Sequence, residues 1–194
     1  MTNKWNLQKE FILASCSPQR LKLLFDAGFE PKECIAADID ESVLKGEKPA
    51  HYVKRVAAQK ASFVALKHPN ECIVAADTII VAKGKIIRKA KDAAVARQNL
   101  DLISNSKHSV LTGYSVIAPS GKQITGLVRT TVYIKKITEN EKIALIQSGE
   151  WKNVAAYRIE GMLSTFVKKI KGSYPNIVGL PVYEIGDILK DVLR

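Results

Sequence analysis

The sequence predicts an α/β protein in which a mixed, twisted β-sheet is flanked by helices. Short apolar runs alternate with helical patterns along the chain, which is typical of an α/β unit. Residues 108–137 form one long hairpin pattern around Pro119, Ser120 and Gly121, so we expect antiparallel as well as parallel strands. No repeat, low-complexity tract or linker-like segment interrupts the 194 residues, which predicts a single domain over residues 1–194.

The first half of the chain alternates strands with two helices. The expected elements are a strand at 10–15, a helix at 17–28, a strand leading into an acidic turn at 34–42, a helix at 48–67, and two strand segments around a polar break at 71–87. The first helix has the clearest ends. Ser17 is a suitable N-cap, Pro18 fits the first helical position, and Gly28 can close the C-terminus.

The second half of the chain adds three helices and the long hairpin. The expected elements are a helix at 91–104, the hairpin at 108–137, and helices at 139–149 and 181–194. Thr138 and Glu141 have the spacing of a capping box for the third of these four elements. Pro181 lies near the start of the last helix, where a proline is tolerated.

Composition narrows the class of protein. Thirty lysines and arginines against 19 acidic residues give a net charge of +11, and such basic proteins attract phosphate-bearing partners. No apolar stretch is long enough to span a bilayer, and no secretory signal is visible, so we expect a cytoplasmic protein without a membrane partner. The three cysteines are far apart and form no CxxC pair, which argues against disulfides and a zinc site.

The stretch from Ser15 to Arg20 is a candidate anion site at a strand-to-helix junction. The start of a helix offers free backbone N–H groups and partial positive charge. Ser15 and Ser17 add hydroxyl donors, and the Arg20 guanidinium matches phosphate oxygens. A plain N-cap beside a surface arginine explains the same residues equally well, so local chemistry alone leaves both interpretations open.

A second candidate group is acidic and a third is cationic. Asp77 interrupts an apolar run, and a buried aspartate is costly unless it is paired or binds metal. With Glu41 it could hold a hard divalent cation through oxygen ligands. Lys60 lies near the apolar side of its helix and Lys89 follows a strand. Each lysine alone is typical of a solvated surface, but together with these sites they favour a triphosphate-binding site.

Six short motifs follow one another along the chain: LASCSPQRLKLL, DIDES, YVKRVAAQKA, AADTII, HSVLTG and AAYRIEG. In this order they make the chain resemble the Maf family of nucleoside triphosphate pyrophosphatases. The resemblance extends from about Ile12 to Val182 and implies a fold similar to that of the inosine triphosphatase class. It also implies hydrolysis of a nucleoside triphosphate to the monophosphate and pyrophosphate with Mg²⁺ or Mn²⁺, by a cytosolic enzyme that is usually dimeric.

The resemblance also implies roles for individual residues. Phosphate-binding roles fall on Ser15, Ser17, Arg20, Lys60 and Lys89. Glu41 would bind metal, and Asp77 would bind metal or activate water. Thr78, in the ADT form of its motif, resembles the branch of the family that acts on dTTP and UTP.

Three departures from the family pattern bear on the substrate. Gln19 replaces the first arginine of the usual SPRR loop, and Arg88 to Ala90 read RKA where GKP is usual. Glu160 stands where a glutamine would read the base. An ionised glutamate only accepts hydrogen bonds, so it suits an N–H donor such as that of guanine better than a ring carbonyl.

Two other classes of function compete with a metal-dependent pyrophosphatase acting on dTTP, UTP or a modified nucleotide. The three departures favour a nucleotide-binding regulator of cell division with little or no catalysis. The net charge favours a nucleic-acid-binding protein. The sequence argues against the latter, because aromatic residues make up only 7% of the chain and no recognised nucleic-acid-binding module occurs.

Overall fold

The chain divides into two compact units, each assembled from separate stretches of the sequence. The computed structural model describes residues 5, 7–87, 89–152, 154 and 157–194. Unit 1 comprises residues 1–78, 112–128 and 179–194, and unit 2 comprises residues 79–111 and 129–178. The expectation that residues 1–194 form a single domain stays a prediction.

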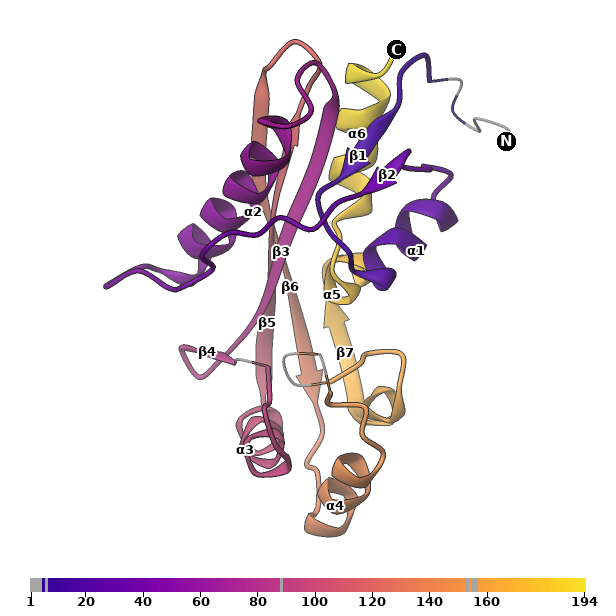
Figure 1. Ribbon diagram of the computed structural model, residues 1–194. Helices are drawn as coiled ribbons and strands as arrows, with labels where there is room; N and C mark the ends of the chain where they lie inside the picture. Colours follow the sequence, from indigo (N-terminus) through magenta and orange to yellow (C-terminus); the bar gives the residue numbers. More distant parts are fainter. Residues whose placement is uncertain (1–4, 6, 88, 153, 155–156) are drawn as a thin grey trace. The chain divides into compact units, whose positions relative to one another are not determined.

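One mixed sheet runs through the described part of the chain. Its strands follow the order β2-β1-β3-β5-β6-β7, and β4 pairs with β3. β1 pairs in parallel with both β2 and β3, whereas β3–β4 and β6–β7 are antiparallel. The bounds are β1 Phe11–Leu13, β2 Glu33–Cys34, β3 Cys72–Ala82, β4 Lys85–Ile87, β5 Lys107–Ile117, β6 Gln123–Ile134 and β7 Val167–Lys171. The predicted α/β class with a mixed sheet is confirmed (Figure 1).

The helices match the sequence prediction closely. Their bounds are α1 Pro18–Asp26, α2 Pro49–Ala65, α3 Ala93–Ile103, α4 Glu139–Gln147, α5 Tyr174–Val178 and α6 Val182–Val192, with a 3₁₀ turn, η1, at Met162–Phe166. Ser17 caps α1, and Thr138 and Glu141 form the expected capping box of α4. No helix among the described residues is long and apolar enough to cross a membrane.

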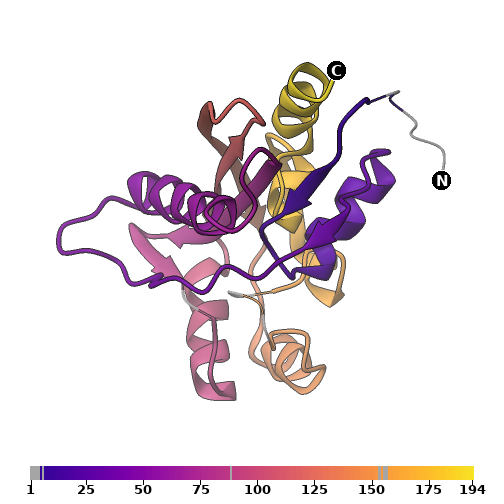
Figure 2. The same cartoon turned by 45° about the horizontal axis from the view of Figure 1, so that its top comes forward.

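In unit 1 the strands are buried on both faces. Alternate residues of a strand point to opposite sides, so Phe11 and Leu13 of β1 pack against α1 and α6, while Ile12 packs against α2 on the other face. The end of α6 lies beside the start of β1 in both views, and the Gln8 N–H donates to the Leu193 carbonyl at 2.9 Å (Figures 1 and 2).

In unit 2 the described apolar core lies on one face of the sheet. Val110 of β5 and Val132 and Ile134 of β6 pack with Leu100 and Ile103 of α3. The Lys83–Gly84 turn joins β3 to β4, and both residues have positive φ, as a two-residue hairpin turn of type I′ requires.

Three sequence expectations differ from the structure. The polar break expected within residues 71–87 is absent, since β3 continues through Asp77 and Thr78. The carboxylate is tolerated there because it is paired with a lysine. The strand expected at 34–42 is reduced to β2, and the residues that follow are held by side-chain hydrogen bonds. β7, η1 and α5 were not expected, because residues 162–178 show no clear periodicity.

His108 and Tyr157 join two of the sequence motifs inside unit 2. His108 Nε2 and the Tyr157 hydroxyl lie 2.5 Å apart, and His108 is 2% exposed. Burial lowers the pKa of His108 to about 4 and raises the pKa of Tyr157. The His108 ring is therefore neutral in the folded protein at neutral pH.

This burial predicts an acid-sensitive fold. An unfolded histidine titrates near pH 6.5, so the unfolded chain takes up this proton first as the pH falls. We expect the free energy of unfolding to fall by about 3 kcal/mol between pH 6.5 and pH 4 on account of His108. Urea unfolding across this range measures it. His108→Gln should flatten the decline, whereas His51→Gln, at an exposed position, should leave it unchanged; an equal decline in both variants would contradict the assignment.

Candidate active site

The loop between β1 and α1 brings the predicted phosphate-binding residues together. Ser15 lies two residues after the end of β1, Ser17 is the N-cap of α1, and Arg20 lies in the first turn of that helix. The Ser15 hydroxyl accepts hydrogen bonds from the Ser17 N–H at 3.2 Å and from Arg20 Nη1 at 3.1 Å. The three side chains therefore form one cluster rather than an isolated cap beside a surface arginine.

The Nε end of the Arg20 guanidinium is held by a main-chain carbonyl from a distant segment of the chain. Its Nε donates to the Gly179 carbonyl at 2.9 Å, and its Nη2 lies 3.5 Å from the Thr78 hydroxyl. Burial lowers the pKa of Arg20, and the charges of Asp77 and Glu41 oppose that shift. A guanidinium has five N–H donors and stays protonated. Three of the five donors bond to Ser15, Thr78 and Gly179. The other two have no partner among the described residues and can bind an anion.

The backbone at the start of α1 contributes less than the sequence suggests. Pro18 has no N–H, and the Arg20 N–H donates to the Ser17 hydroxyl at 3.4 Å. The Gln19 N–H is the remaining donor in this turn without a hydrogen bond to the described residues. The Arg20 side chain is consequently the main anion-binding group of this loop.

Lys60 and Asp77 form a buried ion pair, and the exposed carboxylate of Glu41 joins it at Lys60. Lys60 Nζ lies 2.9 Å from Asp77 Oδ1 and 2.9 Å from Glu41 Oε1. Lys60 is 9% exposed and Asp77 is 7% exposed, so neither charge could be kept without a partner. Lys60 lies inside the fold rather than at the edge of the apolar face, and it brings two carboxylates from separate elements to one ammonium group.

A glycine in β5 sets the position of α2, which carries Lys60. A Cβ atom on Gly113 would lie 2.1 Å from the Val53 carbonyl oxygen of α2. The helix backbone therefore packs directly on the strand at this point, with no space for a side chain. This contact gives the glycine of the HSVLTG motif a structural role.

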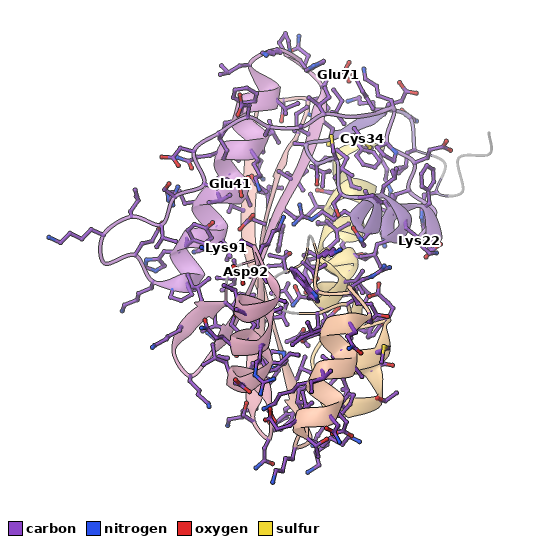
Figure 3. The ribbon with its side chains drawn as sticks, turned by 60° about the horizontal axis from the view of Figure 1, so that its bottom comes forward. Lys22, Cys34, Glu41, Glu71, Lys91 and Asp92 are labelled. Carbon is purple, nitrogen blue, oxygen red and sulfur yellow. The ribbon has the colours of Figure 1, made fainter. Side chains whose placement is uncertain are left out.

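The segment that carries Glu41 is held on α2 by side chains. The Tyr52 hydroxyl donates to the Glu41 carbonyl at 2.9 Å, and Arg55 Nη2 donates to the Ser42 carbonyl at 2.9 Å. Arg55 also pairs with Glu47 at 2.7 Å and lowers the pKa of that carboxyl to about 2. Figure 3 shows Glu41 beside α2. These contacts keep Glu41 within reach of Lys60 without regular secondary structure.

Thr78 of β3 makes hydrogen bonds to β5 and to the turn at Gly179. Its hydroxyl lies 2.9 Å from that of Thr112 and 3.2 Å from the Gly179 carbonyl oxygen. This carbonyl also accepts from Arg20, so Thr78 and Arg20 share an acceptor. The base-specificity role that the sequence suggests for Thr78 stays a prediction, and the contacts assign it a further role in positioning Arg20.

Lys89 and Glu160 belong to unit 2, and both side chains are exposed. Arg88, Asn153, Ala155 and Ala156 lie outside the described residues, so the RKA departure and the AAYRIEG motif are described only in part. Asp92, labelled in Figure 3, caps α3 by accepting from the Val95 N–H at 2.8 Å. The phosphate-binding role of Lys89 and the base-reading role of Glu160 stay predictions.

The cluster is compatible with a divalent cation. The described residues contain no group of three or more histidine, cysteine, aspartate or glutamate side chains that could enclose a metal. Mg²⁺ needs no such cage, because it is commonly bound by one or two carboxylates together with substrate phosphates and water. Asp77 Oδ2 is buried and has no hydrogen-bond partner among the described residues. Asp77 and Glu41 therefore offer the oxygen ligands that such a cation requires.

Three residues of this site were not expected from the sequence: Thr112, Gly113 and Gly179. Thr112 and Gly113 lie in the HSVLTG motif, which was used only to establish the resemblance. Gly179 has a φ of +130°, a conformation that favours glycine, and the Gly-Leu-Pro sequence at 179–181 was a signal for a turn there.

Comparisons with known proteins place the chain in a family. The family model described as Maf-like protein matches residues 10–192, and the chain belongs to the Maf family. It is 40% identical over 179 residues to a dTTP/UTP pyrophosphatase of Caulobacter vibrioides, with 92% of this chain and 93% of that protein covered. It is 44% identical over 179 residues to a nucleoside triphosphate pyrophosphatase of Ehrlichia ruminantium, again with 92% and 93% covered.

Among solved structures, the chain aligns with the nucleoside-triphosphatase, or dITP/XTP pyrophosphatase, of Mycobacterium abscessus. The TM-score is 0.41 and the identity is 18%, over 66% of this chain and 74% of that one.

The contact between Gly113 and α2 gives a stability prediction. In Gly113→Ala the added methyl group would meet the Val53 carbonyl, and backbone yields less readily than a side chain. We expect a loss of about 3 kcal/mol in the free energy of unfolding, at the upper end for overpacked sites. Gly121→Ala is the control, because it adds only the strain of a positive φ, about 1 kcal/mol, in open space. Urea unfolding of both variants measures the difference, and equal losses would contradict the role of Gly113.

Proposed function

We propose that this chain is a metal-dependent pyrophosphatase that converts dTTP or UTP to the monophosphate and pyrophosphate. Relatives about 40% identical over most of their length carry the name dTTP/UTP pyrophosphatase. The observation that carries the proposal is how the two carboxylate oxygens of Asp77 are bound. One oxygen of this buried carboxylate is held by Lys60, and the other has no partner among the described residues.

Lys60 keeps Asp77 ready for chemistry at its second oxygen. An ammonium group 2.9 Å away pairs with one oxygen of this carboxylate and fixes its orientation. The free oxygen can accept a proton from an attacking water molecule or ligate a cation, and both roles need the ionised form. A divalent cation held by Glu41 and Asp77 would supply charge neutralisation for the phosphates and acidify bound water.

The loop after β1 is suited to the phosphates of the substrate. Arg20 presents its two remaining N–H donors, and the Ser15 and Ser17 hydroxyls lie beside it. In the proposed reaction, water attacks the α-phosphorus and the bond to the bridging oxygen breaks. Negative charge develops on the departing pyrophosphate, and positioned cations stabilise it. Lys60 and Lys89 are proposed to contribute to this binding.

We propose a role in base specificity for Glu160 and, separately, for Thr78. A glutamate that only accepts hydrogen bonds differs from the glutamine usual in the family. The relatives are named for dTTP and UTP, whose bases present one N–H between two ring carbonyls, whereas Glu160 by itself favours a base with adjacent N–H groups, such as guanine. A modified nucleotide is therefore the alternative to dTTP and UTP as the substrate.

Pyrophosphate release from a panel of nucleoside triphosphates tests the proposed reaction. We expect release from dTTP and UTP with Mg²⁺ or Mn²⁺ and none in the presence of a chelator. Asp77→Asn should lower turnover about a thousandfold, because the amide cannot act as a base and is a poor metal ligand. Asp26→Asn, which removes only an exposed partner of Lys22, is the matched control and should retain full activity.

Two outcomes would contradict this proposal. Undiminished hydrolysis by Asp77→Asn would remove Asp77 from the reaction. Nucleotide binding without pyrophosphate release from any member of the panel would favour the regulator that the sequence left as an alternative. Circular dichroism of the variants shows that each remains folded.

Glu160→Gln tests the choice of base separately. Glutamine both donates and accepts hydrogen bonds, so it can face a ring carbonyl as well as an N–H group. We expect kcat/KM for dTTP and UTP to rise about tenfold relative to that for GTP, the usual value of one well-placed hydrogen bond to a base. Glu30→Gln, at an exposed position in unit 1, controls for the change in charge. An unchanged ratio across all bases would exclude Glu160 from specificity.

The family resemblance also leads us to propose a homodimer and a cytoplasmic location. Light scattering coupled to gel filtration measures the first, and cell fractionation measures the second.

A further inference from the structure

Unit 2 contains a groove of about 470 Å³ on the sheet face opposite its apolar core. The Lys83–Gly84 turn and strands β5, β6 and β7 contribute its lining. In β6 the residues alternate, so that Val132 and Ile134 are buried while Arg129, Thr131 and Tyr133 line the groove. The strands β3, β5, β6 and β7 are neighbours in the sheet (Figure 1), so the groove crosses about 14 Å of strand spacing.

Cations dominate this groove. Lys83, Lys107, Arg129 and Lys171 line it, all four are exposed, and each comes from a different element. The register between β6 and β7 pairs Lys169 with Tyr133, which places a fifth cation on the same face. No aspartate or glutamate is among the described residues that line the groove.

The groove cations have no acidic partners among the described residues, in contrast to Arg97 and Lys142 of the same unit. Arg97 pairs with Glu139, and Lys142 pairs with Asp101 and Glu139. The cations of the groove make no ion pair with any described residue. Several like charges on one face repel one another, and an anion bound across them would relieve that repulsion.

The other groups in the groove indicate what kind of anion fits. Ser109 and Thr131 offer hydroxyl groups between the cations, and the partly exposed Tyr133 ring offers an aromatic surface. Cations that follow a groove, interleaved with an aromatic ring, are the features by which proteins bind single-stranded nucleic acid. In such proteins the cations contact the phosphates, and the aromatic ring stacks on a base.

We propose that this groove binds the phosphate backbone of a single-stranded nucleic acid, with a base stacked on Tyr133. A second copy of the chain is a poor occupant through the same face, because a two-fold contact would bring ten cations together. A lipid surface is a poor occupant because the face is hollowed rather than flat. The net charge points to such a partner, but the place of this site could not be predicted, since its cations are dispersed from residue 83 to residue 171.

A labelled oligonucleotide tests the proposal. Fluorescence anisotropy with a single strand of about 12 mixed-sequence nucleotides measures the affinity at several salt concentrations. The titration contains chelator and saturating unlabelled dTTP, so that the proposed active site is occupied and silent. We expect binding that weakens steeply with salt, as counterion release requires.

Two triple variants separate the groove from net charge. Lys107→Gln, Arg129→Gln and Lys171→Gln together should weaken binding at least about tenfold and lower the salt slope by about 2, at about 0.7 per phosphate contact. The control changes Lys122, Lys136 and Lys168 to glutamine; these lysines are exposed and do not line the groove. It loses the same charge and should retain most of the affinity. Both triple variants should keep the pyrophosphatase rate of the parent, which shows that they are folded.

Tyr133→Ala distinguishes a nucleic acid from other polyanions. Loss of stacking should weaken the oligonucleotide about tenfold and leave any binding of inorganic polyphosphate unchanged. Equal loss of binding in both triple variants, binding of polyphosphate but not of the oligonucleotide, or binding only to anionic vesicles would each overturn the proposal. A dimer that dissociates in the groove variant alone would assign this face to a second copy instead.

Discussion

The need to neutralise buried charge at Lys60 organises the candidate active site. An ammonium group that is 9% exposed is stable only with anionic partners, and Asp77 and Glu41 provide them at 2.9 Å each. Asp77 belongs to a central strand, whereas Glu41 belongs to a segment without regular structure. The ion pair with Lys60 therefore holds Glu41 against α2, and Lys60 brings the two carboxylates to one ammonium group.

Two glycines of unit 1 position the groups around this cluster. Gly113 allows α2 to touch β5, which sets the depth of Lys60. Gly179 supplies a carbonyl that orients both Arg20 and Thr78. In unit 2 the buried His108 needs no partner of opposite charge. Its low pKa keeps the ring neutral, and the ring is paired with Tyr157. Lys60 is thus paired with opposite charge, whereas His108 is held uncharged.

Local chemistry in the sequence was sufficient for much of the fold. The caps at Ser17 and Thr138 and the alternation around residues 108–137 are local signals, and the structure confirms each of them. The continuity of β3 through Asp77 could not be predicted, because it depends on a lysine 17 residues earlier in the chain. The support of Arg20 by Gly179 joins residues 159 positions apart and involves a carbonyl that every residue type carries. The groove in unit 2 could not be predicted for a similar reason, because only the pairing of the strands brings its cations together.

The way in which Glu41 is held has a consequence for how the family can diverge. Residues 35–48 have no helix or strand, and the contacts from Tyr52 and Arg55 attach them to α2 through main-chain carbonyls and one carboxylate. A carbonyl acceptor survives almost any substitution in the segment that bears it. Insertions and exchanges can therefore accumulate between β2 and α2 without disturbing the sheet. The segment that carries Glu41 can therefore change in sequence while its carbonyl contacts to α2 remain.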